Sequence, residues 1–212
     1  ATGTLVGSFP SNSMTAFSGR LAFGAGGTGW VLASGSETRA WYRRGTTWTE
    51  SPQVFPDSVV ADVSASRDGR RFFAAIWEIS GDPAELAREQ TLPTTENVAG
   101  KLRLFGAGRL DSQWENTWTA DTVFEPRAFL PPLTNRPEGY EGRFALAHAA
   151  AVGVNHQNGA TLAYTDFQRR TLRLARVGAL APDVLDLDVT IGQHVSLTLD
   201  GNDQALVGYA DL

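Results

Sequence analysis

The stretch VSASRDG (63–69) recurs 132 residues further along the chain as VSLTLDG (195–201). Each stretch is followed by a short apolar segment with an aromatic residue and an acid at its end, FFAAIWE (72–78) and ALVGYAD (205–211). A third segment of this kind is ATLAYTD (160–166). A recurring unit of this size predicts stacked or radially arranged β-sheets, because such sheets bury their faces only against neighbouring copies.

Most of the chain has the pattern of short strands separated by turns. In residues 171–176, Leu172 and Leu174 alternate with Arg173, which is typical of a half-buried strand. Asn158-Gly159 predicts a two-residue type I′ hairpin turn, since both central positions of that turn need a positive φ. Asp68-Gly69 and Asp200-Gly201 carry the same chemistry and predict further turns.

One segment has a helical signal. Residues 82–90 read DPAELAREQ, in which Asp82 can cap the first turn and Pro83 suits the first helical position. We expect one short helix here, inserted in an excursion between two strands that closes near Gly100.

Aligning the recurring pieces gives four units, at about residues 17–55, 59–124, 144–189 and 191–212. The fourth unit ends after two strands, and an open strand edge tends to pair with another strand. Three outcomes are consistent with this. The amino-terminal strand at 4–9 closes the array, which is our first expectation; a second chain completes it; or the sequence is a piece of a longer protein.

The later units resemble the repeats of sialidase-like β-propellers. Residues 161–166 followed by 172–176, and residues 194–211, are similar to the strand–turn–strand pattern of those repeats. SRDGRRF (66–72) resembles the Asp-box turn of sialidases, with different spacing. The resemblance implies an all-β, propeller-like array of about four antiparallel blades in one domain over residues 1–212. A partial propeller completed by another chain is the alternative.

Composition excludes several classes of protein. The net charge of −5, with Lys101 as the single lysine, argues against a sequence-independent nucleic-acid binder, which needs clustered Lys and Arg. The chain has no Cys, which excludes disulfides and thiolate metal sites. No apolar run reaches the length of about 18 residues that predicts a membrane span. Richness in Gly, Thr, Ser and Trp with little Lys favours a secreted or cell-surface location.

No motif predicts a catalytic residue. GAGGTG (24–29) has the letters of the dinucleotide-binding fingerprint, but a strand follows it instead of a helix, so we expect a hairpin turn. His148, His156 and His194 lack metal-ligand spacing, and neither HExxH nor GxSxG is present. His148 lies in an apolar stretch and is expected in or near the core.

The sequence contains one candidate recognition group. Tyr42, Arg43 and Arg44 follow Trp41 on a predicted strand, and aromatic and arginine side chains are enriched at binding hot spots. Trp residues on strands otherwise belong to the core between packed sheets. We expect Trp41, Tyr42, Arg43 and Arg44 to contact a ligand.

The chain has one candidate metal site. DGND (200–203) resembles the start of a calcium loop, so Asp200 and Asn202 are candidate ligands, although the distal Glu of an EF-hand is missing. Asp200 also suits a turn, through its side chain and the following Gly. We expect no cofactor, with calcium as the alternative.

These observations favour a non-catalytic extracellular or cell-surface module that binds a protein or a glycan. The first alternative is a glycoside-hydrolysing enzyme, for which the sialidase resemblance implies an arginine cluster and a Tyr–Glu pair. Candidates of these types are Tyr42, Arg43, Arg67, Glu125 and Arg127. The second alternative is a structural subunit whose open edge strand completes another chain's sheet, as a homo-oligomer or hetero-oligomer.

Overall fold

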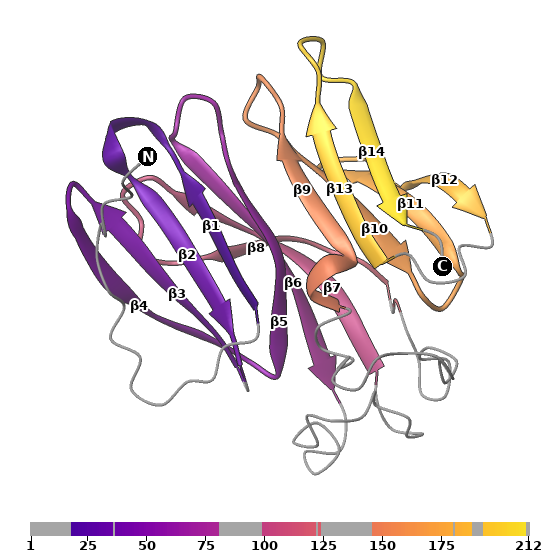
Figure 1. The fold of residues 1–212 in the computed structure, drawn as a ribbon, viewed down its shortest axis with the longest axis horizontal. Helices are drawn as coiled ribbons and strands as arrows, with labels where there is room; N and C mark the ends of the chain where they lie inside the picture. The colour runs from indigo at the N-terminus through magenta and orange to yellow at the C-terminus, as the bar shows by residue number, and fades with distance from the viewer. Residues whose placement is uncertain are drawn as a thin grey trace, which may run out of the picture.

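The computed structural model describes residues 18–35, 37–80, 99–121, 123, 146–179, 181–187 and 193–210. In this part of the chain, strands β1 to β14 form four antiparallel sheets, which confirms the all-β prediction (Figure 1). The predicted helix at 82–90 and the predicted amino-terminal strand at 4–9 lie outside the described residues.

Each sheet is built from consecutive strands, and we name the sheets A to D in chain order. Sheet A holds β1 (Ser18–Phe23), β2 (Gly29–Ser34), β3 (Glu37–Arg44) and β4 (Thr47–Pro56). Sheet B holds β5 (Ser58–Ala65), β6 (Arg71–Ser80), β7 (Ala99–Gly108) and β8 (Glu115–Thr119). Sheet C holds β9 (Ala150–Val154), β10 (Ala160–Asp166), β11 (Thr171–Arg176) and β12 (Asp183–Leu187). Sheet D holds only β13 (Gln193–Leu199) and β14 (Ala205–Ala210).

The first strands of the four sheets lie side by side. Strand β1 contacts β5, β5 contacts β9, and β9 contacts β13 (Figure 1). No backbone ladder joins these strands, because each sheet is a separate hydrogen-bonded unit. The sheets are therefore held together by side chains packed between their faces.

The core consists of three layers, each between two successive sheets. Trp30 and Leu32 of sheet A pack against the sheet B side chains Phe72 and Ile76. The layer between sheets B and C includes Trp77, Leu104, Val152 and Leu162, and the layer between C and D includes Leu172, Leu174 and Val195. Burying one such side chain contributes about 1.5–3 kcal/mol, so each sheet depends on its neighbours for stability.

The turns between the first two strands share one pattern in all four sheets, although the turn of sheet B is one residue longer than the others. The backbone amide of its first residue donates to a carbonyl at its end: Gly24 to Thr28 (2.9 Å), Ser66 to Arg71 (2.8 Å), Asn155 to Gly159 (2.9 Å) and Asp200 to Gln204 (2.9 Å). The fourth residue of each turn has a positive φ, at Gly27 (72°), Gly69 (65°), Asn158 (62°) and Asp203 (62°). The hairpin after β1, expected from residues 24–29, is confirmed; it carries a short 3-10 turn, η1 (Ala25–Gly27).

Two details of the sequence interpretation are wrong. Gly159 does not have a positive φ, so Asn158-Gly159 does not form a two-residue type I′ turn. Because the equivalent turns begin at Ser66 and Asp200, the first strands of sheets B and D repeat after 134 residues, not 132, and their second strands repeat after 133. Val63 therefore corresponds to Leu197, with Val195 two residues earlier on the same face.

Candidate functional site

The outer face of sheet A is exposed at Leu21 and Phe23, whereas the equivalent faces of the other sheets are covered. The residue three positions before the first turn points toward the preceding sheet in sheets B and C, where Val63 is 6% and Val152 4% exposed. The equivalent residue of sheet A is Leu21, which is 53% exposed. Among the described residues, no sheet precedes sheet A.

An aromatic row with an arginine at its centre crosses this open face. Phe23, Gly29, Arg43 and Trp48 lie opposite one another across β1 to β4. Phe23 is 51% exposed; its ring centroid lies 6.2 Å from that of Trp48, and the guanidinium of Arg43 lies 5.6 Å from the same ring. A Cβ on Gly29 would lie 2.8 Å from the Phe23 ring, so the glycine lets that ring lean over β2.

A second row runs beside the first. Leu21, Val31, Trp41 and Glu50 lie opposite one another, and Trp41 is 7% exposed. At the β3–β4 side of the face, Arg39 is ion-paired with Glu37 (Nε–Oε1 2.6 Å) and with Glu50 (Nη1–Oε1 3.1 Å). These ion pairs raise the pKa of Arg39. The open face thus combines apolar and aromatic side chains with a charged margin. We call it the sheet A face.

The predicted recognition group is divided between two faces of β3, because side chains of a strand alternate. Trp41 and Arg43 lie on the sheet A face. Tyr42 points toward sheet B, with its ring centroid 5.5 Å from that of Trp30. Arg44 covers the Tyr42 ring at 5.2 Å and donates a hydrogen bond to the carbonyl of Leu110. Tyr42 and Arg44 therefore help to join sheets A and B.

A second polar cluster lies along the first strands. We call Arg20, Asp62, His148 and His194 the first-strand cluster. Arg20 lies on β1, Asp62 on β5 and His194 on β13, and His148 lies two residues before β9. Nε of Arg20 donates to the carbonyl of Ala61 (2.6 Å). Its Nη2 donates to the carbonyl of Ala147 (2.6 Å) and lies 3.5 Å from Nδ1 of His148.

Asp62 links β5 to β9. Its Oδ1 accepts the amide of Val63 (2.8 Å) and its Oδ2 accepts the amide of Val152 (2.8 Å). Burial raises the pKa of Asp62, while these two amides and Arg20 act in the opposite direction. The side chains of Arg20 and Asp62 thus supply hydrogen bonds between first strands that no backbone ladder joins.

The two histidines of the cluster contact each other. Their ring centroids are 4.7 Å apart with the planes at 38°. Burial lowers the pKa of His148, and the nearby charges of Arg20 and His194 lower it further. His194 has a φ of 66° within β13, a conformation that is uncommon outside glycine and tends to occur at functional sites.

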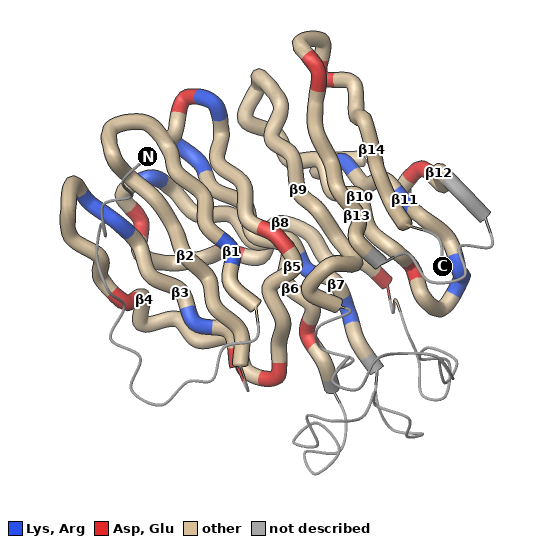
Figure 2. The backbone as a smooth tube through the Cα atoms, viewed as in Figure 1, with Lys and Arg blue, Asp and Glu red and all other residues tan. Residues whose placement is uncertain are grey.

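Side chains of the first turns form a third cluster, at the opposite end of the first strands. His156 bridges Asp203 (Nδ1–Oδ1 2.7 Å) and Arg67 (Nε2–Nη1 3.1 Å), and Nδ2 of Asn158 donates to Asp68 (3.1 Å). Acidic and basic residues are interspersed at the β5–β6 turn (Figure 2). These contacts join the turns of sheets B, C and D, which supports a structural role.

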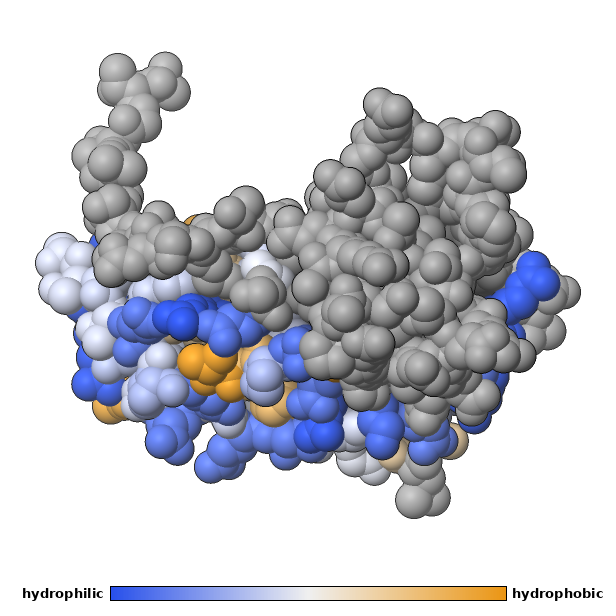
Figure 3. All heavy atoms as spheres, turned by 90° about the horizontal axis from the view of Figure 1, so that it is seen from below, coloured by the Kyte–Doolittle hydropathy of each residue, from blue (hydrophilic) through white to orange (hydrophobic). Residues whose placement is uncertain are grey.

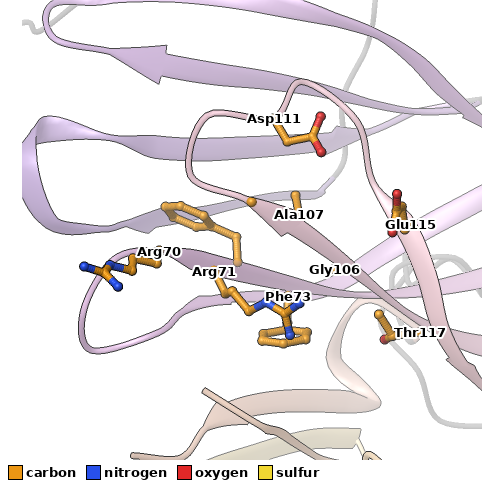
Figure 4. Close-up of a pocket in the computed structure, with 10 residues that line it drawn as sticks. Arg70, Arg71, Phe73, Gly106, Ala107, Asp111, Glu115 and Thr117 are labelled. Carbon is orange, nitrogen blue, oxygen red and sulfur yellow. The ribbon is translucent and has the colours of Figure 1, made fainter. Parts of the chain in front are cut away.

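A hollow of about 240 Å³ lies over β6, β7 and β8 (Figure 4). Arg70 and Arg71 line it from the start of β6, and Asp111 and Glu115 from the β7–β8 connection and β8. Its charged groups are of both signs and are exposed, so they do not select a ligand of one charge.

Asp200 acts in its turn. Its Oδ1 accepts the amides of Asn202 (2.8 Å) and Gln204 (2.8 Å), which is the turn geometry expected of an Asp at this position. In the described ranges, no three His, Asp or Glu side chains lie close enough together to hold a metal ion. Calcium binding by Asp200 and Asn202 stays a prediction.

The residues that a sialidase would need are not gathered in the described part of the chain. Arg43 contacts Phe23 on the sheet A face, and Arg67 contacts His156 at the turns. Glu125 and Arg127 lie outside the described residues.

No family model matches the chain, and no curated protein matches it either. No helix in the described segments is both long and apolar enough to cross a membrane. The sequence interpretation missed Phe23, Arg20 and Asp62. Phe23 precedes a glycine-rich turn, and nothing in the sequence around it indicates binding. Arg20 and Asp62 can be recognised only in the structure, where β1, β5 and β9 lie side by side.

Proposed function

We propose that this chain is a non-catalytic recognition module of the β-propeller type, secreted or at the cell surface, that binds a protein partner through the sheet A face. One observation carries the proposal: Leu21 is exposed at the position where the other sheets bury an apolar side chain against a preceding sheet. Consecutive four-stranded meanders with adjacent first strands support the propeller architecture.

A protein partner suits this face better than a glycan. Its equivalents in the same molecule pack against β-sheets, so its shape and spacing are those of a sheet-packing surface. Contiguous exposed apolar side chains mark protein interaction sites, and Arg and Trp, here Arg43 and Trp48, are enriched at hot spots. The charged margin of Arg39 and Glu50 would fix the orientation of the partner.

The test places a photo-crosslinking phenylalanine analogue at position 23 of the full chain. Leu110, which is 66% exposed but lies in the β7–β8 connection, is the matched control position. With extracellular protein from the source cells, we expect a discrete crosslinked protein from position 23 that is lost when Arg43→Glu is added, and none from position 110. Equal crosslinking from both positions would reject the proposal.

Two further assays address the rival functions. A defined glycan array would favour glycan recognition if binding were lost in Phe23→Ala. Turnover of fluorogenic glycosides by the full chain would favour a glycosidase.

The two-stranded sheet D favours a second candidate, the structural subunit. In the described residues, no third strand pairs with β13 or β14, and Leu206 on β14 is 62% exposed. An apolar edge strand is a template for pairing with another chain. Light scattering tests this: a concentration-dependent increase in mass that Leu206→Lys removes supports edge pairing, and a strict monomer excludes self-pairing.

A further inference from the structure

We propose that Arg43, on the sheet A face, binds a carboxylate of the protein partner, from an Asp or Glu side chain that stands among apolar ones. This step rests on the proposed function, because it names the chemistry of the partner for the same face.

Arg43 carries a charge that the described part of the chain does not neutralise. Its guanidinium lies 5.6 Å from the Phe23 ring, and it forms no ion pair with a described acid. Its Nε is buried and has no hydrogen-bond acceptor among the described residues. The residue as a whole is half-buried, so the terminal nitrogens of the guanidinium reach the surface while Nε does not. Buried polar groups without a partner are rare in proteins, and each one calls for an explanation.

The other arginine of this face is already neutralised. Arg39 lies four residues before Arg43 on β3, so the two side chains project from the same side of the strand. Arg39 is paired with Glu37 and Glu50, two carboxylates of its own chain. Arg43 has the same chemistry without such carboxylates, so an acid of the partner is the group that would complete it.

The surroundings of Arg43 favour such a pair. The exposed side chains near it are apolar, Phe23 and, one row further, Leu21. Seen from below, by contrast, the described surface is mostly hydrophilic, with apolar side chains confined to small areas (Figure 3). A partner that covers Phe23 and Leu21 excludes water from the guanidinium, which strengthens a pair of parallel hydrogen bonds between arginine and carboxylate. A partner without an acid would bury the guanidinium unpaired, which opposes binding.

The test uses binders of known sequence, selected from a display library of fibronectin type III domains in which one sheet face is randomised. The library is selected on the full chain, and binders are kept if the neutral change Leu21→Asn weakens them, since Leu21 marks the sheet A face. We expect the kept binders to share an Asp or Glu among apolar residues. The same selection on Arg43→Gln should yield binders without that shared acid.

The affinity of a kept binder then measures the contact itself. Arg43→Gln should weaken binding about ten- to hundredfold, the loss of a charge-assisted pair. Arg70→Gln is the matched control, because Arg70 is an exposed arginine in the β5–β6 turn whose side chain is 78% accessible, and it should leave the dissociation constant unchanged. Changing the acid of the binder to its amide should cost as much as Arg43→Gln. The two changes together should cost no more than either alone, because they break the same contact.

The outcomes separate this inference from the proposed function. Binders that depend on Leu21 but share no acid, or two changes whose effects add, would overturn the role of Arg43 and leave the sheet A face as a binding surface. A selection that yields no binder dependent on Leu21 would contradict the proposed function as well. Crosslinking of the purified chain to itself from position 23 would show that a second copy covers the face, and would also overturn the inference.

Discussion

Leu21 and Val63 occupy the same position in two successive sheets, yet Leu21 is 53% exposed and Val63 only 6%. Both residues lie three positions before a first turn, on strands that each pair antiparallel with the second strand of their sheet. The difference arises from what lies in front of each sheet. Sheet A packs against the side of sheet B that carries Val63, and no described sheet packs against the side of sheet A that carries Leu21.

This contrast shows that local structure and exposure have separate origins in a repeated array. The strand and turn follow from the residues of each unit, whereas burial depends on the neighbouring unit. A surface that repeats a buried face is therefore evidence for a missing neighbour. The contrast also predicts that equivalent substitutions on the two faces differ strongly in cost.

The largest expected difference is between two tryptophans of sheet A. Trp30 is fully buried between sheets A and B, and Trp48 lies on the sheet A face. Trp30→Ala should lower the free energy of unfolding by about 3–5 kcal/mol, because it leaves a cavity between the sheets. Trp48→Ala should cost about 1 kcal/mol or less. Denaturant unfolding measures both; similar losses would mean that the sheet A face is covered in solution.

The next effect concerns hydrogen bonds between first strands. Asp62→Ala leaves the amides of Val63 and Val152 without their carboxylate acceptor, and should lower the free energy of unfolding by about 1–3 kcal/mol. Asp111, an exposed carboxylate that accepts one amide in a turn, is the control, and its change to Ala should have a smaller effect. If the two substitutions cost the same, Asp62 does not join β5 to β9.

The all-β class could be predicted because alternation and turn residues are local signals. The division of Trp41 and Tyr42 between two faces also follows from alternation, but their exposure does not, since it depends on what covers each face. The first-strand cluster could not be predicted. Arg20 and Asp62 are separated by a whole sheet, and no spacing in the sequence marks residues that meet only when first strands align.

The repeat length illustrates a subtler failure. The two Asp-Gly pairs gave a spacing of 132 residues, but Gly69 takes the positive φ of its turn and Gly201 does not. In the β13–β14 turn, the residue with the positive φ is Asp203. The same dipeptide can occupy different positions of a turn, because Asn and Asp tolerate the left-handed region as glycine does.

A smaller effect tests the equivalence of the four turns. Asn158 has a φ of 62° at the fourth position of its turn, where sheets A and B have glycine. Asn158→Val and Asn158→Gly both remove the hydrogen bond to Asp68, but only valine opposes the backbone conformation. Asn158→Val should be less stable than Asn158→Gly by about 1–2 kcal/mol. Equal thermal stabilities would show that this position is not left-handed in solution.

The smallest effect is a pH dependence of stability that arises at the first turns, from the contact between Asp203 and His156. The amide and imidazole of His156 hold the pKa of Asp203 below its ordinary value of 3.8. A lowered folded-state pKa contributes stability above the ordinary value, and that stability is lost as the pH falls through the folded-state value. Asp203→Asn keeps a residue that tolerates a positive φ but cannot ionise, so the loss of stability on acidification should be shallower in the variant. Because the side chain of Asp203 is partly exposed to solvent, which screens its charge, the difference should be smaller than those above. Parallel stability curves from neutral to strongly acidic pH would mean that the contact between His156 and Asp203 does not join sheets C and D in solution.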